Sequence, residues 1–375
     1  MTYARSRLWL GMSAVGTIVL VATVILATQG HSNLLAVPGG ADGREFMLLA
    51  GAVGLWATVM IPFDFFGGYL LPKHFERSVP SMPQFVLKWA RGVLIQSGLI
   101  AVFLWCILQA AQFGGLFAAI FTMVMAQMGL IVCQKHVASM VARLRSPDAG
   151  PCGFQEHGFV VATSSSDTGF TGSIVGLPGF EKVIVPESWV CNLNAEQLTA
   201  EITRRRGAIQ TGSRTRGVVL AFAVNTLTFA VCTQLPFAGV LTVSELLSAS
   251  LYFTLASFVW LLILPRWSRE GVFEADRFAV ETGVPVELLK ETAESIESLH
   301  DDESKRSRQL ESVFHPIPCV KRRVAELSLR IRSFRGFWNV ARMTLFLSWS
   351  CGGFLSRAVH CNIGRPELWV MLPAD

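Results

Sequence analysis

Long apolar stretches alternate with charged segments along the chain, and this alternation predicts its organisation. A membrane-spanning helix needs about 20 predominantly apolar residues, because lipid offers no hydrogen-bond partner to an open backbone. Six stretches meet this requirement and run over about 9–28, 46–71, 92–111, 114–133, 217–237 and 243–264. The sequence therefore predicts a polytopic α-helical membrane protein with six spans, of which the third and fourth, and the fifth and sixth, form hairpins.

Two apolar segments need separate interpretation. The second span contains Pro62 and, near its predicted cytoplasmic end, Asp64. A carboxylate inside a membrane is costly, so Asp64 is either solvated at the interface or has a functional role within the membrane. A further apolar run at 344–355 is too short to cross a bilayer, and we expect an interfacial or core helix there.

Lysine and arginine in the connecting segments predict the orientation of the spans. Cytoplasmic loops of membrane proteins carry an excess of these residues. Here they precede the first span, separate the second from the third and the fourth from the fifth, and follow the sixth, whereas the alternate loops carry only Arg44. We therefore expect both termini and both large polar segments on the cytoplasmic side of a plasma (inner) membrane.

Composition supports the lipid bilayer as the main partner. Hydrophobic residues make up 51% of the chain and charged residues 16%, against about 25% charged residues in a soluble domain. The formal net charge of +5 does not indicate nucleic-acid binding, because the basic residues cluster beside the apolar stretches. The 8 cysteines show no CxxC spacing and the 7 histidines no i, i+4 pair, so local spacing supplies no metal site.

The polar segment between the fourth and fifth spans combines strands with a helix. The β-rich runs 158–162 and 182–185 predict two strands around a turn. Asn194 and Gln197 have the spacing of a capping box, which predicts a helix that continues through Arg204, Arg205 and Arg206. After the sixth span, further helices are expected from Val286 and over 320–334, the latter basic and amphipathic.

The order of motifs in these polar segments resembles a known family. The run 179–186 and the helix after Asn194 come first, the hairpin 217–264 follows, and three late elements complete the series. These are Phe273-Glu274-Ala275-Asp276-Arg277-Phe278-Ala279, His315-Pro316 and Arg323-Val324-Ala325-Glu326-Leu327. Over about 155–330 the chain thus resembles the membrane zinc metallopeptidases of bacterial HtpX and the eukaryotic CAAX-prenyl endopeptidase. The resemblance implies a cytoplasmic, mostly α-helical α+β domain split by a transmembrane hairpin, with Asp276, His315 and Arg323 at family-like positions.

The zinc-binding positions implied by this resemblance have lost their chemistry. An HExxH helix holds zinc on two histidines one turn apart and uses the glutamate as general base. Alignment on Gly207 puts Arg204 and Ala208 at the two histidines and Arg205 at the glutamate. Alignment on Ala275-Asp276 puts Val272 at the third ligand, a glutamate. Guanidinium groups have no lone pair for a metal, so we expect no functional catalytic residue, no metal and no cofactor.

Three functions are compatible with these features. The leading hypothesis is a catalytically inactive peptidase-like protein, a pseudopeptidase, that binds or regulates another membrane protein or a peptide segment. The second is an active zinc endopeptidase that uses displaced ligands such as Glu201, Glu274 or His315. The third is a transport or lipid-handling protein built on the first four spans and Asp64.

Several segments leave two interpretations open. Arg204, Arg205 and Arg206 form either a solvated helix face or a contact for anions or acidic lipids. The polar stretch 163–172 is either a flexible turn or, as the resemblance implies, part of a peptide-binding groove. The expected division of the chain is 1–134 (four spans), 135–216 (first peptidase-like half), 217–265 (hairpin), 266–335 (second half) and 336–375 (interfacial or packing segment).

Overall fold

A computed structural model of the chain describes residues 2–30, 43–77, 79–142, 160–163, 170–300, 307, 311, 313–328 and 335–371. The side chains of 142, 160–163, 300 and 371 are not described. Within these ranges, 5 helices are long and apolar enough to cross a membrane. They are Tyr3–Thr28, Arg44–His74, Met82–Val141, Ser213–Cys232 and Val243–Glu281. The protein is therefore a mostly helical membrane protein.

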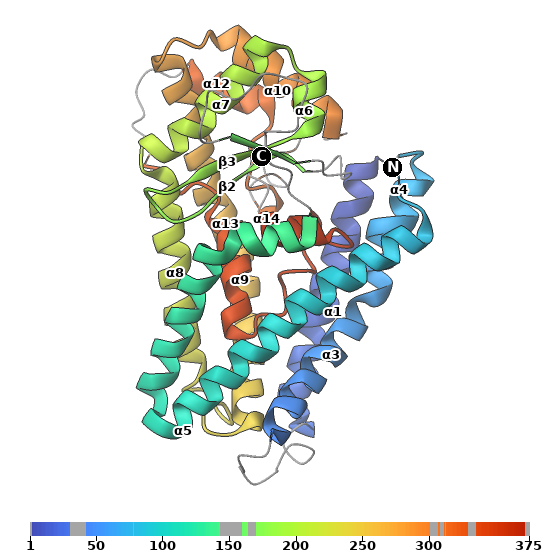
Figure 1. Ribbon diagram of the computed structural model, residues 1–375, viewed down its shortest axis with the longest axis vertical. Coiled ribbons are helices and arrows are strands. Elements are labelled where there is room, and N and C mark those ends of the chain that lie inside the picture. The colour runs from blue at the N-terminus through green and yellow to red at the C-terminus, as the bar shows by residue number, and fades with distance from the viewer. Residues whose placement is uncertain are drawn as a thin grey trace. The chain divides into compact units, whose positions relative to one another are not determined.

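Predicted spans three and four lie within one long helix, α5 (Met82–Ala142), whose path is broken at two glycines. Gly114 and Gly115 leave helical geometry, and Gly115 has a φ of +63°, a conformation that glycine adopts without a Cβ penalty. Figure 1 shows the chain turning back at this point. The hairpin therefore has the predicted place, with its turn one to two residues later than expected.

Two helices run through prolines at which the sequence suggests a break. Pro62 lies inside α3 (Arg44–Phe65), which continues through a π-helical turn at Phe66–Leu70 into α4 (Leu71–His74). Pro265 lies inside α9 (Val243–Glu281). The expected boundary at 265 thus falls within one continuous helix.

The chain divides into two compact units. The first contains residues 1–130, 222–260 and 344–369, and the second contains 131–221, 261–343 and 370–375. The first unit comprises α1 (Tyr3–Thr28), α3, α4, most of α5, the later part of α8 (Ser213–Cys232), the first part of α9 and a C-terminal segment.

The C-terminal segment of the first unit is part of its core. Its apolar run belongs to α13 (Val340–Leu347) and a 3-10 turn at Ser348–Cys351, and the short helix α14 (Pro366–Met371) follows. Leu347, Trp349 and Cys351 are fully buried. Of the two predicted locations for this run, interface or core, the structure has the core.

Asp64 is buried against this C-terminal segment. Its carboxylate accepts hydrogen bonds from the Arg357 guanidinium, the Gly364 backbone N–H (2.9 Å) and the Trp89 indole (3.0 Å). Asp64 and Arg357 are both 0% exposed, and Arg357 also lies over the rings of Trp56 and Trp369. The expectation that Asp64 is solvated at an interface is wrong, because Arg357 supplies its counter-charge inside the first unit.

The second unit is built around a three-stranded sheet of order β1-β3-β2. β1 (Val160–Thr163) runs parallel to β3 (Lys182–Pro186), and β2 (Ser173–Val175) pairs with β3 in the antiparallel direction. The two predicted strands are thus β1 and β3. They are parallel neighbours, and sequence reasoning missed β2 between them in the chain. Residues 158–159 and 164–169 of the predicted strand and polar stretch lie outside the described residues.

Helices pack on this sheet to form the core of the second unit. They are α6 (Glu187–Asn192), α7 (Ala195–Gln210), α10 (Val286–His300), α12 (Val320–Leu327) and the later part of α9 (Figure 1). One hydrophobic cluster joins Val183 and Val185 of β3 to Leu198 of α7, Ile296 of α10 and Trp338. The expected helices from Val286 and Val320 are present, while 329–334 lies outside the described residues.

The Asp64–Arg357 pair leads to a stability prediction. Asp64→Ala leaves a buried guanidinium without its carboxylate, and we expect the first unit to lose about 3–5 kcal/mol of stability. Lys88→Ala, which removes a pair with Glu367 whose lysine is 45% exposed, is expected to cost less than about 1 kcal/mol. Thermal unfolding of the detergent-solubilised protein measures both. An Asp64→Ala variant that unfolds with the wild type would contradict the assignment.

Candidate functional site

Helix α7 carries Arg204 and Arg205, which the alignment on Gly207 predicts at a zinc-ligand and a general-base position. Its start is fixed by a reciprocal capping box, in which Asn194 Oδ1 accepts from the Gln197 backbone N–H (2.8 Å) and Gln197 Oε1 accepts from the Asn194 N–H (3.2 Å). This confirms the predicted helix start. It also fixes which face of α7 meets the core, because side chains recur on one face every three to four residues.

Glu201 binds both arginines from one turn earlier on the same helix. Arg204 donates to it through Nε (2.9 Å) and Nη2 (2.8 Å), and Arg205 donates through Nε (2.9 Å). Exposure is 2% for Glu201, 1% for Arg204 and 0% for Arg205. The interpretation of this triplet as a solvated face is therefore wrong for Arg204 and Arg205, whereas Arg206 is half-buried.

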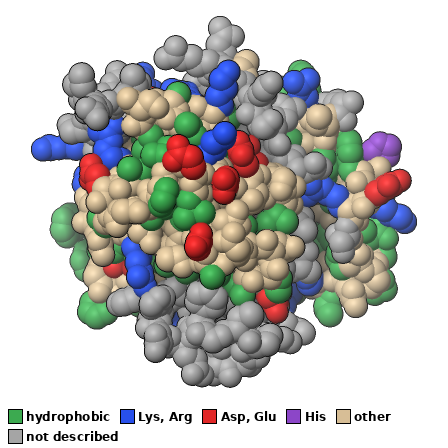
Figure 2. All heavy atoms as spheres, turned by 90° about the horizontal axis from the view of Figure 1, so that it is seen from above, with side chains coloured by type: hydrophobic (Ala, Val, Ile, Leu, Met, Phe, Trp, Pro, Cys, Tyr) green, Lys and Arg blue, Asp and Glu red, His purple; other side chains and the backbone are tan. Residues whose placement is uncertain are grey.

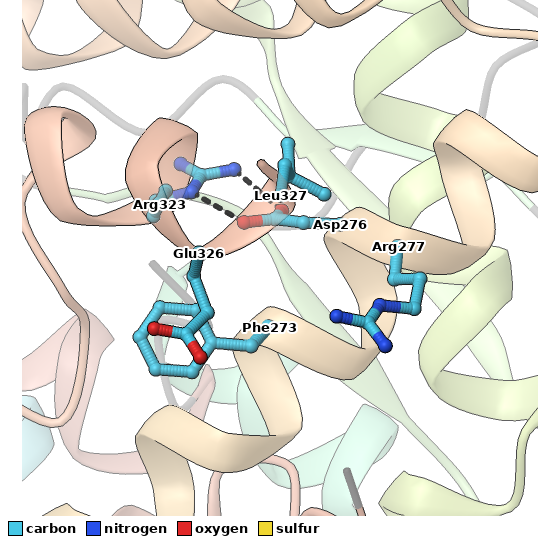
Figure 3. Close-up of a pocket in the computed structure, with 6 residues that line it drawn as sticks. All are labelled: Phe273, Asp276, Arg277, Arg323, Glu326 and Leu327. Atoms are coloured by element: carbon cyan, nitrogen blue, oxygen red, sulfur yellow. Dashed lines mark hydrogen bonds and ion pairs between the residues drawn. The ribbon is translucent and has the colours of Figure 1, made fainter. Parts of the chain in front are cut away.

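A second carboxylate joins α7 to two further helices. Asp276 of α9 accepts a two-point contact from Arg323 of α12, with Nε at 2.8 Å and Nη2 at 2.7 Å (Figure 3). Arg204 Nη1 lies 3.7 Å from the same carboxylate. Glu201, Arg204, Arg205, Asp276 and Arg323 thus form one buried charge cluster that connects α7, α9 and α12. Asp276 thus joins α9 to α12 through Arg323.

The remaining two aligned positions lie in the adjoining apolar core. Ala208 of α7 and Val272 of α9 belong to the same hydrophobic cluster as Trp338. The Arg204 guanidinium lies 5.4 Å from the centre of the Trp338 ring. The hydrophobic cluster that contains Ala208 and Val272 thus extends to Trp338, which faces Arg204.

Arg205 turns toward a different set of groups. It donates to the Thr171 backbone carbonyl and lies 5.1 Å from the centre of the Trp189 ring. Gly172, which has a φ of +76°, passes close to it, and a Cβ there would lie 3.1 Å from the guanidinium carbon. Arg205 thus connects α7 to the segment that leads into β2.

Burial and charge act in opposite directions on the ionisation of the cluster. Burial alone would raise the pKa of Glu201, but the charges of Arg204 and Arg205 hold this pKa below its ordinary value. Burial lowers the pKa of Arg205 to about 10 despite the opposing attraction of Glu201. Burial also disfavours the charge of Arg323, yet Asp276 raises the pKa of this arginine above its ordinary value. Glu201 and Asp276 are therefore each paired with arginines that are charged at neutral pH.

Of the residues considered as displaced ligands, Glu201 and Glu274 have their carboxylates bound by arginines. Glu274 accepts from Arg216 Nη2, 2.7 Å from each carboxylate oxygen, and from the Gly336 N–H (2.7 Å). The His315 backbone carbonyl accepts from Arg269 Nη1 at 3.1 Å. No three His, Cys, Asp or Glu side chains among the described residues gather into a group that could hold a metal ion. The residues at the aligned positions therefore do not fit zinc.

A shallow surface recess lies beside the cluster (Figure 3). Its lining comprises Phe273, Asp276, Arg277, Arg323, Glu326 and Leu327. The paired Asp276 and Arg323 form part of its wall, so this pair is the part of the cluster nearest to the recess.

Sequence reasoning missed two contributors to this region. The spacing of Glu201 from Arg204 and Arg205, three and four residues, is the signal of helical ion pairs and could have identified the cluster on α7. Trp338 and Trp189, whose rings face the two arginines, carry no local signal. Both come from segments that only the fold brings next to α7.

Removal of the carboxylate on α7 tests the cluster. Glu201→Gln leaves two buried guanidinium groups without an ionised partner on their own helix, and we expect it to destabilise the second unit by about 3–5 kcal/mol. The control Glu294→Gln, in a pair with Lys290 whose side chains are more than half exposed, should change stability by less than about 0.5 kcal/mol. Denaturant or thermal unfolding compares the variants. Equal losses would contradict the role of burial.

The lowered pKa of Glu201 predicts acid sensitivity. Its unfolded-state pKa is near 4.5 and its folded-state pKa is lower, so the native state binds the proton less readily. The stability from Glu201 is fully present above pH 4.5 and is lost as pH falls through the folded-state value. We expect this acid-linked component in stability-versus-pH curves of wild type and Glu294→Gln, and its loss in Glu201→Gln. A Glu201→Gln curve parallel to wild type would refute the linkage.

Comparisons with known proteins give matches among solved structures only. No protein-family model and no curated protein matches the sequence. Among solved structures, the crystal structure of S. mikatae Ste24p is similar with a TM-score of 0.65 and 14% sequence identity. The match covers 83% of this chain and 79% of that one. The chain therefore has a Ste24p-like fold.

Proposed function

We propose that the protein is an integral membrane pseudopeptidase, a metallopeptidase-like membrane protein without peptidase activity. The Ste24p-like fold supports a relation to membrane metallopeptidases. The observation that carries the proposal is the buried charge cluster, because Arg204 and Arg205 occupy two of the aligned catalytic positions and are bound by Glu201. A guanidinium group offers neither a lone pair for zinc nor a base near neutral pH.

Loss of zinc chemistry leaves a stable scaffold for binding. The cluster joins α7, α9 and α12 through ion pairs, so the helices that would share a metal are held together without one. We infer that this scaffold acts as a binding or regulatory module for another membrane protein or peptide segment. We place it in the plasma membrane with six crossings, counting the two arms of α5 separately, and with both termini cytoplasmic.

The covered edge of the sheet limits how a peptide could bind. β2 pairs with β3, and its residues Ser173, Ile174 and Val175 are at most 4% exposed. Addition of a peptide strand requires an accessible backbone edge, so β2 does not offer one. Recognition therefore relies on other surfaces of the protein. Acidic-lipid contact by the arginine triplet would rest on Arg206 alone, because Arg204 and Arg205 are buried.

Metal content and proteolysis test the proposal. We expect the protein purified in mild detergent to hold far less than one zinc per chain by elemental analysis, and to show no chelator-sensitive cleavage of casein or a membrane-protein substrate. Arg204 at an aligned ligand position, with Arg205 next to it, would repel the ion.

The same assay distinguishes the displaced-ligand enzyme. Stoichiometric zinc with chelator-sensitive cleavage, abolished by Glu274→Ala and retained in the exposed control Glu294→Ala, would replace our proposal with an active metallopeptidase. Cleavage that persists in both variants and in chelator would indicate a contaminating protease. Zinc without cleavage would overturn the proposed absence of a metal.

A further inference from the structure

The turn between β2 and β3 carries an apolar tip. It runs over 177–180 and closes through a hydrogen bond from the Phe180 N–H to the Leu177 carbonyl (2.9 Å). Gly179 has a φ of +88° at the position where such a turn requires glycine. Phe180 is 80% exposed, and Leu177 and Pro178 are half-buried. The tip thus presents apolar side chains outward from the second unit.

Ion pairs and hydrogen bonds attach this tip to the start of α8. Arg214 Nη2 donates to the Gly176 carbonyl (2.7 Å), and Arg214 Nη1 lies 3.5 Å from Glu181 Oε1. The other carboxylate oxygen of Glu181 accepts from the Gly179 N–H (2.7 Å). Arg214 and Glu181 are at most 6% exposed. Buried contacts at both ends of the turn therefore hold the tip beside the start of α8, at the level of Arg214.

The position of Arg214 along α8 corresponds to the edge of the membrane. Arg214 is the second residue of the apolar helix α8, whose outward face becomes apolar at Val219, which is 61% exposed. Five residues of helix rise about 7.5 Å. This distance is close to the thickness of one headgroup layer, about 5–7 Å, given by the difference between the whole bilayer and its hydrocarbon core. The tip therefore lies at headgroup depth beside α8.

The residues of the tip suit that layer. Aromatic side chains are favoured at the membrane interface, and lysines nearby attract anionic headgroups. The exposed Lys182 follows Phe180 by two residues. We propose that the 177–180 tip inserts into the lipid headgroup layer and anchors the sheet of the second unit to the membrane surface. This inference does not depend on whether the protein cleaves peptides.

Photo-crosslinking to lipid tests the insertion. Benzoylphenylalanine replaces Phe180 in the full-length protein, reconstituted in nanodiscs of zwitterionic and anionic phospholipid, and mass spectrometry after irradiation detects lipid adducts. Leu227 on α8, which is 66% exposed, serves as the lipid-facing control. Lys290 on α10, whose side chain is 52% exposed, serves as the solvent-facing control.

We expect lipid adducts at 180 and 227, with a yield at 180 roughly tenfold above that at 290, as expected for an apolar side chain that partitions into lipid. Lipid adducts at 227 alone would overturn the proposal. Protein crosslinks at 180 in place of lipid, or equal lipid yields at 180 and 290, would overturn it as well.

Discussion

The pairing of buried guanidinium groups with carboxylates is the interaction on which both units depend. An ionised side chain that is removed from water is tolerated only with an opposite charge and hydrogen bonds close by. In the first unit this condition joins Asp64 of α3 to Arg357 of the C-terminal segment. In the second unit it joins Glu201 and Asp276 to three arginines on α7 and α12. In each unit the pairs connect elements far apart in the chain, so correct packing of these elements is a condition for keeping the charges paired.

The charge cluster also joins separate helices of the second unit, as a bound metal ion joins its ligands. A structural or catalytic metal couples its binding energy to folding, because its ligands come from separate elements. Here Arg204 bridges Glu201 on its own helix and Asp276 on α9, and Arg323 attaches α12 to the same carboxylate. The apolar replacements Ala208 and Val272 extend the hydrophobic core up to the cluster. Ion pairs and apolar packing thus connect α7, α9 and α12 in the second unit.

Local patterns predicted much of this architecture, and tertiary contacts determined the rest. The apolar stretches, the capping box at Asn194 and the helix from Val286 depend on neighbouring residues, so the sequence is sufficient to place them. The interpretation of Arg204 and Arg205 as solvated was wrong. It rested on the rule that runs of charged residues are usually exposed, whereas the carboxylates that pair with these arginines come partly from α9. The interpretation of Asp64 as solvated was wrong for the same reason, because its partner Arg357 lies 293 residues later in the chain. β2 was missed because three residues give too little periodicity to recognise a strand.

Burial of the cluster constrains how the protein can meet a partner. Arg204 and Arg205 cannot bind a peptide or a headgroup without losing Glu201, and that loss would leave two charges unpaired inside the unit. Contacts at the outer surface carry no such penalty. Figure 2 shows acidic side chains gathered near the middle of the face seen from above, and Glu287, Glu291 and Glu294 of α10 are exposed. The second unit therefore differs between its interior, where buried arginines pair with carboxylates, and the outer face of α10, where carboxylates are exposed. A binding function can change on the outside of such a unit while the interior pairs that maintain its fold stay the same.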